Sequence, residues 1–213
     1  MYVTVIDLGI GNLMSIIRGL EHWGANVKVT SDPKIILKSS HVVLPGDGAF
    51  NYAMEQIKKK NLLEAIKSFS KSKSNLLGIC IGMQILFDQS NEFKKTEGLG
   101  LISGKVVSIP NKTTGGKKLV LPHIGWNSLL ATDHFKSWGK TLLENNKTMD
   151  EMYFIHSYMA VPDDHTNRVA DCVYGGHKIS AVVMKNNITG CQFHPEKSGQ
   201  LGLKILKKFV EKK

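Results

Sequence analysis

A glycine-flanked cysteine at a strand-to-helix turn constrains this chain more than any other feature. Residues 78–82 read Gly-Ile-Cys-Ile-Gly, after the apolar pair Leu76-Leu77 and before a helix-like stretch at residues 83–87. Such glycines allow a sharp turn and a close approach of neighbouring strands, so Cys80 is expected to project above a sheet. The N-terminus of the next helix would favour the thiolate form of its sulfur. The pattern indicates a nucleophile, and the alternative is an inert cysteine buried in the core.

The order of apolar runs predicts an α/β fold. In the first half, short apolar runs alternate with helix-period segments, which is typical of a parallel sheet. The predicted strands there are residues 3–7, 27–30, 42–44 and 76–79, with helices at 12–23, from 32, and at 50–68. The second half predicts strands at residues 106–109, 118–121, 152–155, 168–174 and 178–184, and a last helix at 201–210. Because no linker intervenes, we expect one domain over residues 1–213, with an antiparallel extension of the same sheet.

Composition excludes several classes of protein. Net charge is +10 over 213 residues, but the lysines are scattered outside any aromatic-rich pattern, so nucleic-acid binding is not expected. No apolar run approaches the roughly 20 residues of a membrane-spanning helix, and no signal peptide is visible. Three widely spaced cysteines favour a reduced, cytoplasmic setting. The histidines show no metal-like spacing, so neither a metal nor another cofactor is expected.

A histidine and a carboxylate lie close together far downstream of the cysteine. His194, Pro195 and Glu196 follow the apolar run at residues 188–193. In an extended segment the first and third of these share a face, and the proline would stiffen that geometry. Glu196 would then orient the imidazole while its other nitrogen takes the proton of Cys80. The sequence therefore predicts a Cys-His-Glu triad, against the alternative of a polar strand end at the surface.

Another small-residue turn ends the predicted strand at residues 42–44. Residues 45–48 read Pro-Gly-Asp-Gly, on the side of the sheet where α/β ligand sites form. Backbone N–H groups in such a turn can point at a developing oxyanion. Taken alone, an ordinary tight turn explains this segment equally well.

Together, these segments resemble the class I (triad-type) glutamine amidotransferases, and among them the glutaminase subunits of imidazole glycerol phosphate synthase. The resemblance covers nearly the whole chain in the family's order. It rests on the cysteine and His-Pro-Glu segments and on residues 6–13, 45–50, 97–102, 122–127 (Pro-His-Ile-Gly-Trp-Asn) and 153–158 (Tyr-Phe-Ile-His-Ser-Tyr). It implies a three-layer fold with a mixed central sheet flanked by helices.

The resemblance also implies a reaction, the hydrolysis of L-glutamine to glutamate and ammonia. Cys80 would form a γ-glutamyl thioester, with His194 as acid and base and Glu196 orienting it. Backbone N–H groups near Gly48 and Ile81 would hold the oxyanion. By similarity, the amino-acid end of the substrate would be bound by Gln84, Glu92, Ser157 and Tyr158.

The family's partner is a (β/α)₈-barrel synthase that receives the ammonia. It makes imidazole glycerol phosphate, in histidine biosynthesis, and an aminoimidazole-carboxamide ribotide. Asn12, Trp126 and Lys197 match positions near the partner-facing side, and the isolated subunit is expected to be nearly inactive.

One position departs from the family, which usually has a small apolar residue where this chain has Asp47. We expect that carboxylate to point away from the site, because it would oppose a developing negative oxygen.

Three other functions are compatible with parts of the pattern. The same glutaminase chemistry occurs in relatives that feed a similar barrel in the biosynthesis of amidino sugars for surface polysaccharides. A stand-alone cysteine hydrolase on this fold would be fully active without a partner, although Gln84 argues against it. A catalytically dead binding module is disfavoured by the intact triad residues.

Overall fold

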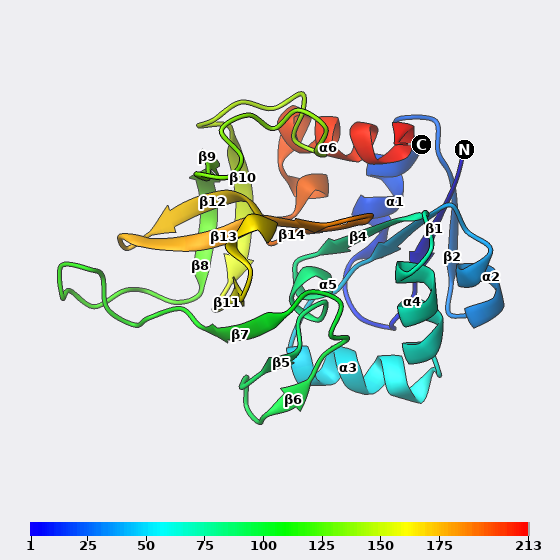
Figure 1. Ribbon diagram of the computed structural model, residues 1–213, viewed down its shortest axis with the longest axis horizontal. Coiled ribbons are helices and arrows are strands. Elements are labelled where there is room, and N and C mark those ends of the chain that lie inside the picture. Colours follow the sequence, from blue (N-terminus) through cyan, green and yellow to red (C-terminus); the bar gives the residue numbers. More distant parts are fainter. Residues whose placement is uncertain (213) are drawn as a thin grey trace.

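The computed structural model describes residues 1–212 and contains three β-sheets, with helices packed on the largest (Figure 1). The elements of the first half are β1 (Tyr2–Ile6), α1 (Leu13–Glu21), β2 (Asn26–Thr30), α2 (Pro33–Leu37), β3 (His41–Leu44), α3 (Phe50–Lys59), α4 (Leu63–Ser70), β4 (Asn75–Ile79) and α5 (Ile81–Gln84). The strands that follow are β5 (Gln89–Ser90), β6 (Thr96–Glu97), β7 (Gly104–Ser108), β8 (His123–Ser128), β9 (Leu130–Ala131), β10 (Glu151–His156), β11 (Tyr158–Pro162), β12 (Arg168–Tyr174), β13 (His177–Lys185) and β14 (Ile188–Cys191). Two 3₁₀ turns, η1 (His165–Asn167) and η2 (Pro195–Lys197), and the helix α6 (Gly199–Glu211) complete the chain.

The central sheet has eight strands in the order β2-β1-β3-β4-β14-β13-β12-β9. Strands β2 to β14 in that order run parallel, and β13, β12 and β9 continue it antiparallel. All residues of β3, β4 and β14 are buried, as expected for strands covered on both faces. The mixed sheet predicted from the order of apolar runs is confirmed.

Helices cover both faces of this sheet and make three layers. Figure 1 shows α1 and α6 together on one face, and α3 and α4 on the other, where α2 packs against α4. The antiparallel half extends away from these helices, on the left of the view. None of the helices described within residues 1–212 combines the length and the apolar character needed to cross a lipid bilayer.

The second half does not all join the central sheet, as the apolar runs suggested. Strands β8 and β10 form a two-stranded antiparallel sheet, and β11-β7-β5-β6 form a four-stranded one. The strand predicted at residues 118–121 is also wrong, because that segment makes only a single bridge, between Lys112 and Lys118. Leu119 and Leu121 pack against the core while Val120 between them is 72% exposed, so the alternation reports one buried face of a segment that pairs with no strand.

The helix predicted at residues 50–68 is two helices, α3 and α4. Asn61 lies between them at φ +55°, a left-handed conformation that ends the first helix. The Gly175-Gly176 turn is present as predicted, because both glycines have positive φ and join β12 to β13 as a two-residue hairpin.

Candidate active site

Three adjacent parallel strands bring the predicted catalytic segments together. In the central sheet β4 lies between β3 and β14, with Gly78 in register with Leu44 on one side and Gly190 on the other. The carboxyl ends of these strands lead directly into Asp47-Gly48, Cys80 and His194. Because parallel strands end at the same edge of a sheet, residues over a hundred positions apart share one site.

The turn at Cys80 has the geometry of a nucleophile elbow. Cys80 has φ +54° and ψ −112°, a strained conformation for a residue other than glycine, which costs on the order of 1–3 kcal/mol. A Cβ atom on Gly82 would lie 1.8 Å from the Leu44 carbonyl oxygen, and one on Gly78 would lie 2.5 Å from the Gly82 oxygen. Only glycine fits at both positions, because the turn lies against β3 at Gly82 and folds back on the end of β4 at Gly78. The helix after Cys80 is one turn long, shorter than predicted.

His194 and Glu196 are paired, but not in an extended segment as predicted. Pro195 begins the 3₁₀ turn η2, for which His194 is the N-cap residue. The carboxylate folds back so that Glu196 Oε1 lies 2.7 Å from His194 Nδ1, with both side chains at most 3% exposed. The turn is held by the Ser198 hydroxyl, which donates to the His194 carbonyl at 2.6 Å and accepts from the Tyr153 N–H at 2.9 Å.

Opposing influences act on the charge of His194. Burial alone lowers its pKa, but the neighbouring Cys80 sulfur and the Glu196 carboxylate, which is hydrogen-bonded to Nδ1, outweigh that cost and raise the pKa to about 10. The imidazole therefore takes a proton readily when the sulfur beside it gives one up. Its Nε2 atom is buried without a hydrogen-bond partner among the described residues, and the Cys80 thiol donates instead to the Ile155 carbonyl at 3.9 Å.

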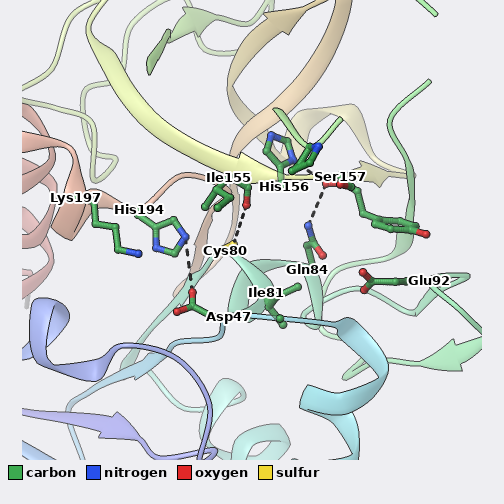
Figure 2. Close-up of a pocket in the computed structure, with 13 residues that line it drawn as sticks. Asp47, Cys80, Ile81, Gln84, Glu92, Ile155, His156, Ser157, His194 and Lys197 are labelled. Carbon is green, nitrogen blue, oxygen red and sulfur yellow. Dashed lines mark hydrogen bonds and ion pairs between the residues drawn. The ribbon is translucent and has the colours of Figure 1, made fainter. Parts of the chain in front are cut away.

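Asp47 does not point away from the site, which corrects the sequence-based expectation. Figure 2 shows its carboxylate directed toward His194, with Asp47 Oδ1 3.8 Å from His194 Nε2. The other carboxylate oxygen accepts the Asn12 N–H at 3.2 Å. These two contacts hold a negative charge beside the nitrogen that faces the nucleophile.

The two N–H groups predicted for the oxyanion are unequal in this structure. The Ile81 N–H donates to the Gly46 carbonyl at 3.3 Å and so already has an acceptor. Gly48 is exposed at φ +90°, in the turn that also carries Asp47. The bond between the Ile81 N–H and the Gly46 carbonyl must break before that N–H can donate to an oxyanion.

A cavity of about 400 Å³ opens in front of the sulfur, within the size range of small-molecule sites. Its lining includes His194 and all the residues predicted as nucleophile, oxyanion hole and substrate site: Gly48, Cys80, Ile81, Gln84, Glu92, Ser157 and Tyr158. Glu92 lies at the far end of the cavity from His194 (Figure 2). Burial raises the pKa of Glu92, although an N–H from Phe50, donated at 2.7 Å, lowers it in part.

The three residues predicted at the partner interface are all exposed. Lys197 lines it, and Asn12 lies beside Asp47. Trp126, on β8, is 54% exposed and packs edge-on against Tyr153 of β10. No group of three or more His, Cys, Asp or Glu side chains able to hold a metal ion occurs among residues 1–212.

Sequence reasoning missed three buried polar side chains next to the site. Gln192 lies between Gln84 and the sulfur, and His123 and His156 form a hydrogen-bonded pair behind Tyr158. The signal for Gln192 was present, since it is a polar residue within the otherwise apolar run at residues 190–193, two positions before His194. The histidine pair joins two strands whose register the sequence does not specify.

Comparisons with known proteins agree with this geometry. Residues 4–213 match the family described as glutamine amidotransferase class-I. The imidazole glycerol phosphate synthase subunit HisH 1 of Legionella pneumophila (strain Lens) is 44% identical over 209 residues, covering 98% of each chain. Subunit HisH of Lactococcus lactis subsp. lactis (strain IL1403) is also 44% identical, over 215 residues and 98% of each chain.

Solved structures share the fold at lower identity. A crystal structure of a glutamine amidotransferase aligns with a TM-score of 0.70 at 15% identity, over 94% of both chains. A glutamine amidotransferase from Thermotoga maritima aligns with a TM-score of 0.62 at 17% identity, over 92% of this chain and 76% of that one. The three-layer fold expected from the resemblance is thus confirmed.

Proposed function

Because this chain belongs to the class-I glutamine amidotransferase family, together with the HisH subunits, we propose that it is a glutaminase that supplies ammonia to a synthase partner. The substrate is L-glutamine and the products are glutamate and ammonia. The observation that carries the proposal is the placement of Cys80, on a strained elbow, at the base of a cavity beside the buried His194–Glu196 pair.

The reaction begins with proton transfer from Cys80 to His194 Nε2, for which the raised pKa of the imidazole is suited. The sulfur attacks the carboxamide carbon and forms a tetrahedral intermediate. Its oxyanion accepts hydrogen bonds from the N–H groups of Gly48 and Ile81. His194 then gives its proton to the leaving ammonia, which leaves a γ-glutamyl thioester. Water, activated by His194, attacks the thioester and releases glutamate and the thiol.

The amino-acid end of the substrate binds at the other end of the cavity. There the Glu92 carboxylate can pair with the substrate's ammonium group. Gln84 also lines this cavity, and its side-chain oxygen has no partner among the described residues. A carboxylate acceptor at this end suits a cationic amine better than a neutral peptide, which supports glutamine over a peptidase substrate.

The partner we propose is a (β/α)₈-barrel synthase that makes imidazole glycerol phosphate and an aminoimidazole-carboxamide ribotide in the cytoplasm, as part of histidine biosynthesis. An exposed apolar face on β8 and β10 supports a docked partner, since Ile124 is 56% exposed, Trp126 54% and Ile155 40%. Ile155 also lines the cavity, so the face reaches the mouth of the site. Aromatic side chains with exposed surfaces of this kind are enriched in protein interfaces.

The test is Cys80→Ala in the complex with the barrel that co-purifies with this chain. Glutamine-dependent synthesis should be lost, whereas synthesis driven by added ammonium salts should remain, because the acceptor chemistry lies on the partner. A variant that still uses glutamine would show that the nucleophile is assigned wrongly. High glutamine or peptide turnover by the isolated chain would favour a stand-alone hydrolase, and a barrel that acts on a sugar would change the acceptor.

A further inference from the structure

The buried amide of Gln192 is a polar side chain within contact of the proposed nucleophile that has no role in the proposed mechanism. Gln192 follows β14 and has no exposed surface. Its Nε2 atom lies 3.9 Å from Cys80 Sγ, and its Oε1 atom accepts from Gln84 Nε2 at 3.0 Å. Since a carboxamide holds oxygen and nitrogen on opposite arms, the contact with Gln84 turns the N–H group toward sulfur.

The direction of the Gln84 amide is fixed in turn. Gln84 Nε2 lies 3.1 Å from the Tyr158 carbonyl oxygen and 3.0 Å from Gln192 Oε1. A backbone carbonyl only accepts, so the group that faces it must be NH₂. A reversed Gln84 would place its oxygen against the Tyr158 oxygen, and a reversed Gln192 would set two donors against each other. One orientation of each amide satisfies all three contacts.

The Tyr158 carbonyl is also held from behind, by two neutral histidines. It accepts from His156 Nδ1 at 2.8 Å, so His156 Nε2 is left to accept from His123 Nδ1 at 3.0 Å. His123 Nε2 then accepts from the Asn127 amide at 3.2 Å. Burial lowers the pKa of both histidines to about 4, so near neutral pH each is uncharged. The Tyr158 carbonyl therefore accepts from His156 on one side and from Gln84 on the other, which fixes its place between the histidine pair and the two amides.

We infer that Gln192 is a positioning residue for the nucleophile, whose N–H group favours the thiolate form of Cys80 and whose direction is set by Gln84. The inference rests on the proposed function. A hydrogen bond to the charged form of a group favours that form, and bonds to ions are stronger than bonds between neutral groups. The Ile155 carbonyl, also 3.9 Å from Sγ, accepts from a thiol and repels a thiolate, so the Gln192 donor opposes it.

Alkylation of Cys80 by iodoacetamide, followed from pH 5 to 9.5 on the full chain, reads out the thiolate directly. Gln192→Met keeps the length of the side chain but has no donor, and Gln192→Glu places a carboxylate there. We expect the midpoint of the alkylation profile to rise by about one pH unit in the first and further in the second. Cys172 and Cys191 are buried with raised pKa values, and Cys80→Ala measures their background.

Gln84→Met provides a second variant, which leaves Gln192 in place and removes the group that orients it. The midpoint of its alkylation profile should rise by a smaller amount. Should Gln192→Met fail to fold, the Gln84→Met profile alone tests the inference. Gln200→Met, on the exposed start of α6, is the matched control and should leave the profile unchanged.

Unshifted midpoints in both folded variants would overturn the inference, because a purely structural role would lower the melting temperature without moving the titration of sulfur. If the natural chain still hydrolysed glutamine with its partner in that case, the proposed function would be kept and only the role of Gln192 would be rejected. A shifted profile in a chain that never hydrolyses glutamine would overturn the proposed function instead.

Discussion

Replacing Asp47 by asparagine removes the negative charge beside the proposed general base and keeps a side chain of nearly the same size. Asp47 Oδ1 lies 3.8 Å from His194 Nε2, while Oδ2 accepts the Asn12 N–H at 3.2 Å. An asparagine oxygen can still accept from Asn12, so the turn at residues 45–48 keeps that contact. The substitution therefore isolates the charge from the shape of the turn.

The size of the effect follows from the distance and the exposure. In the proposed mechanism the oxyanion forms beside the sulfur, and the repulsion is worked out for a separation of about 4–5 Å from this carboxylate. Two like charges 4–5 Å apart repel by about 3–4 kcal/mol at an effective dielectric constant of 20. The Asp47 side chain is 41% exposed, so solvent screens much of this repulsion. We take the repulsion energy that remains as about 1.4 kcal/mol. That energy corresponds to about a tenfold change in rate.

We therefore expect Asp47→Asn to hydrolyse glutamine about tenfold faster than the natural chain when no partner is present. Glutamate release at saturating glutamine measures this directly. Asp163→Asn is the matched control. Asp163 is exposed and lies outside the cavity lining, so this substitution also removes one carboxylate but not one beside His194. Unchanged or slower hydrolysis in Asp47→Asn would refute the reasoning, since the charge would then not oppose the transition state.

Three further predictions concern other parts of the molecule. His194→Ala should lower glutamine turnover by on the order of 10²–10⁴-fold, and Glu196→Ala by less, since Glu196 orients the imidazole but transfers no proton; an equal loss would contradict these roles. His123 and His156 take up a proton near pH 6.5 in the unfolded chain but only near pH 4 in the folded chain. The free energy of unfolding should therefore fall as the pH drops from 6.5 to 4, by at most about 3 kcal/mol for each histidine. Urea midpoints at pH 7, 5.5 and 4.5 measure this slope, which a double His→Gln variant should flatten; an equal slope in that variant would exclude the pair as its source. Trp126→Ala should weaken binding of the barrel about tenfold, measured by titration calorimetry, while leaving the melting temperature of the isolated chain unchanged; undiminished binding would place the interface elsewhere.

The parallel half and the nucleophile turn could be predicted because their signals are local. The glycines around Cys80 are required by contacts of less than 3 Å, and no other residue type satisfies them. Strands β3 and β4 read as uninterrupted apolar runs because both their faces are covered. A residue choice forced by its own neighbourhood is visible in the sequence.

The arrangement of the second half could not be predicted, because alternation shows that a strand has one buried face but not which strand it pairs with. Strand β7 pairs with β11, in the register Val106 with Ala160, and not with the central sheet. The direction of Asp47 was hidden for a similar reason. The two atoms that hold its carboxylate, on Asn12 and His194, come from segments 35 and 147 positions away in the chain.

Strand β10 shows why the site and the exposed face cannot be interpreted separately. Its Tyr153 carbonyl accepts the His194 N–H at 3.0 Å, and its Ile155 carbonyl faces the sulfur of Cys80. The same strand pairs with β8, so that Tyr153 lies opposite Trp126 on the exposed apolar face. The extended His-Pro-Glu geometry was a wrong prediction, because the fixed φ of Pro195 also suits the first position of a 3₁₀ turn, and the bonds of Tyr153 to His194 and Ser198 hold that turn. A protein bound to that face would therefore contact the same strand that holds both the base and the nucleophile in place.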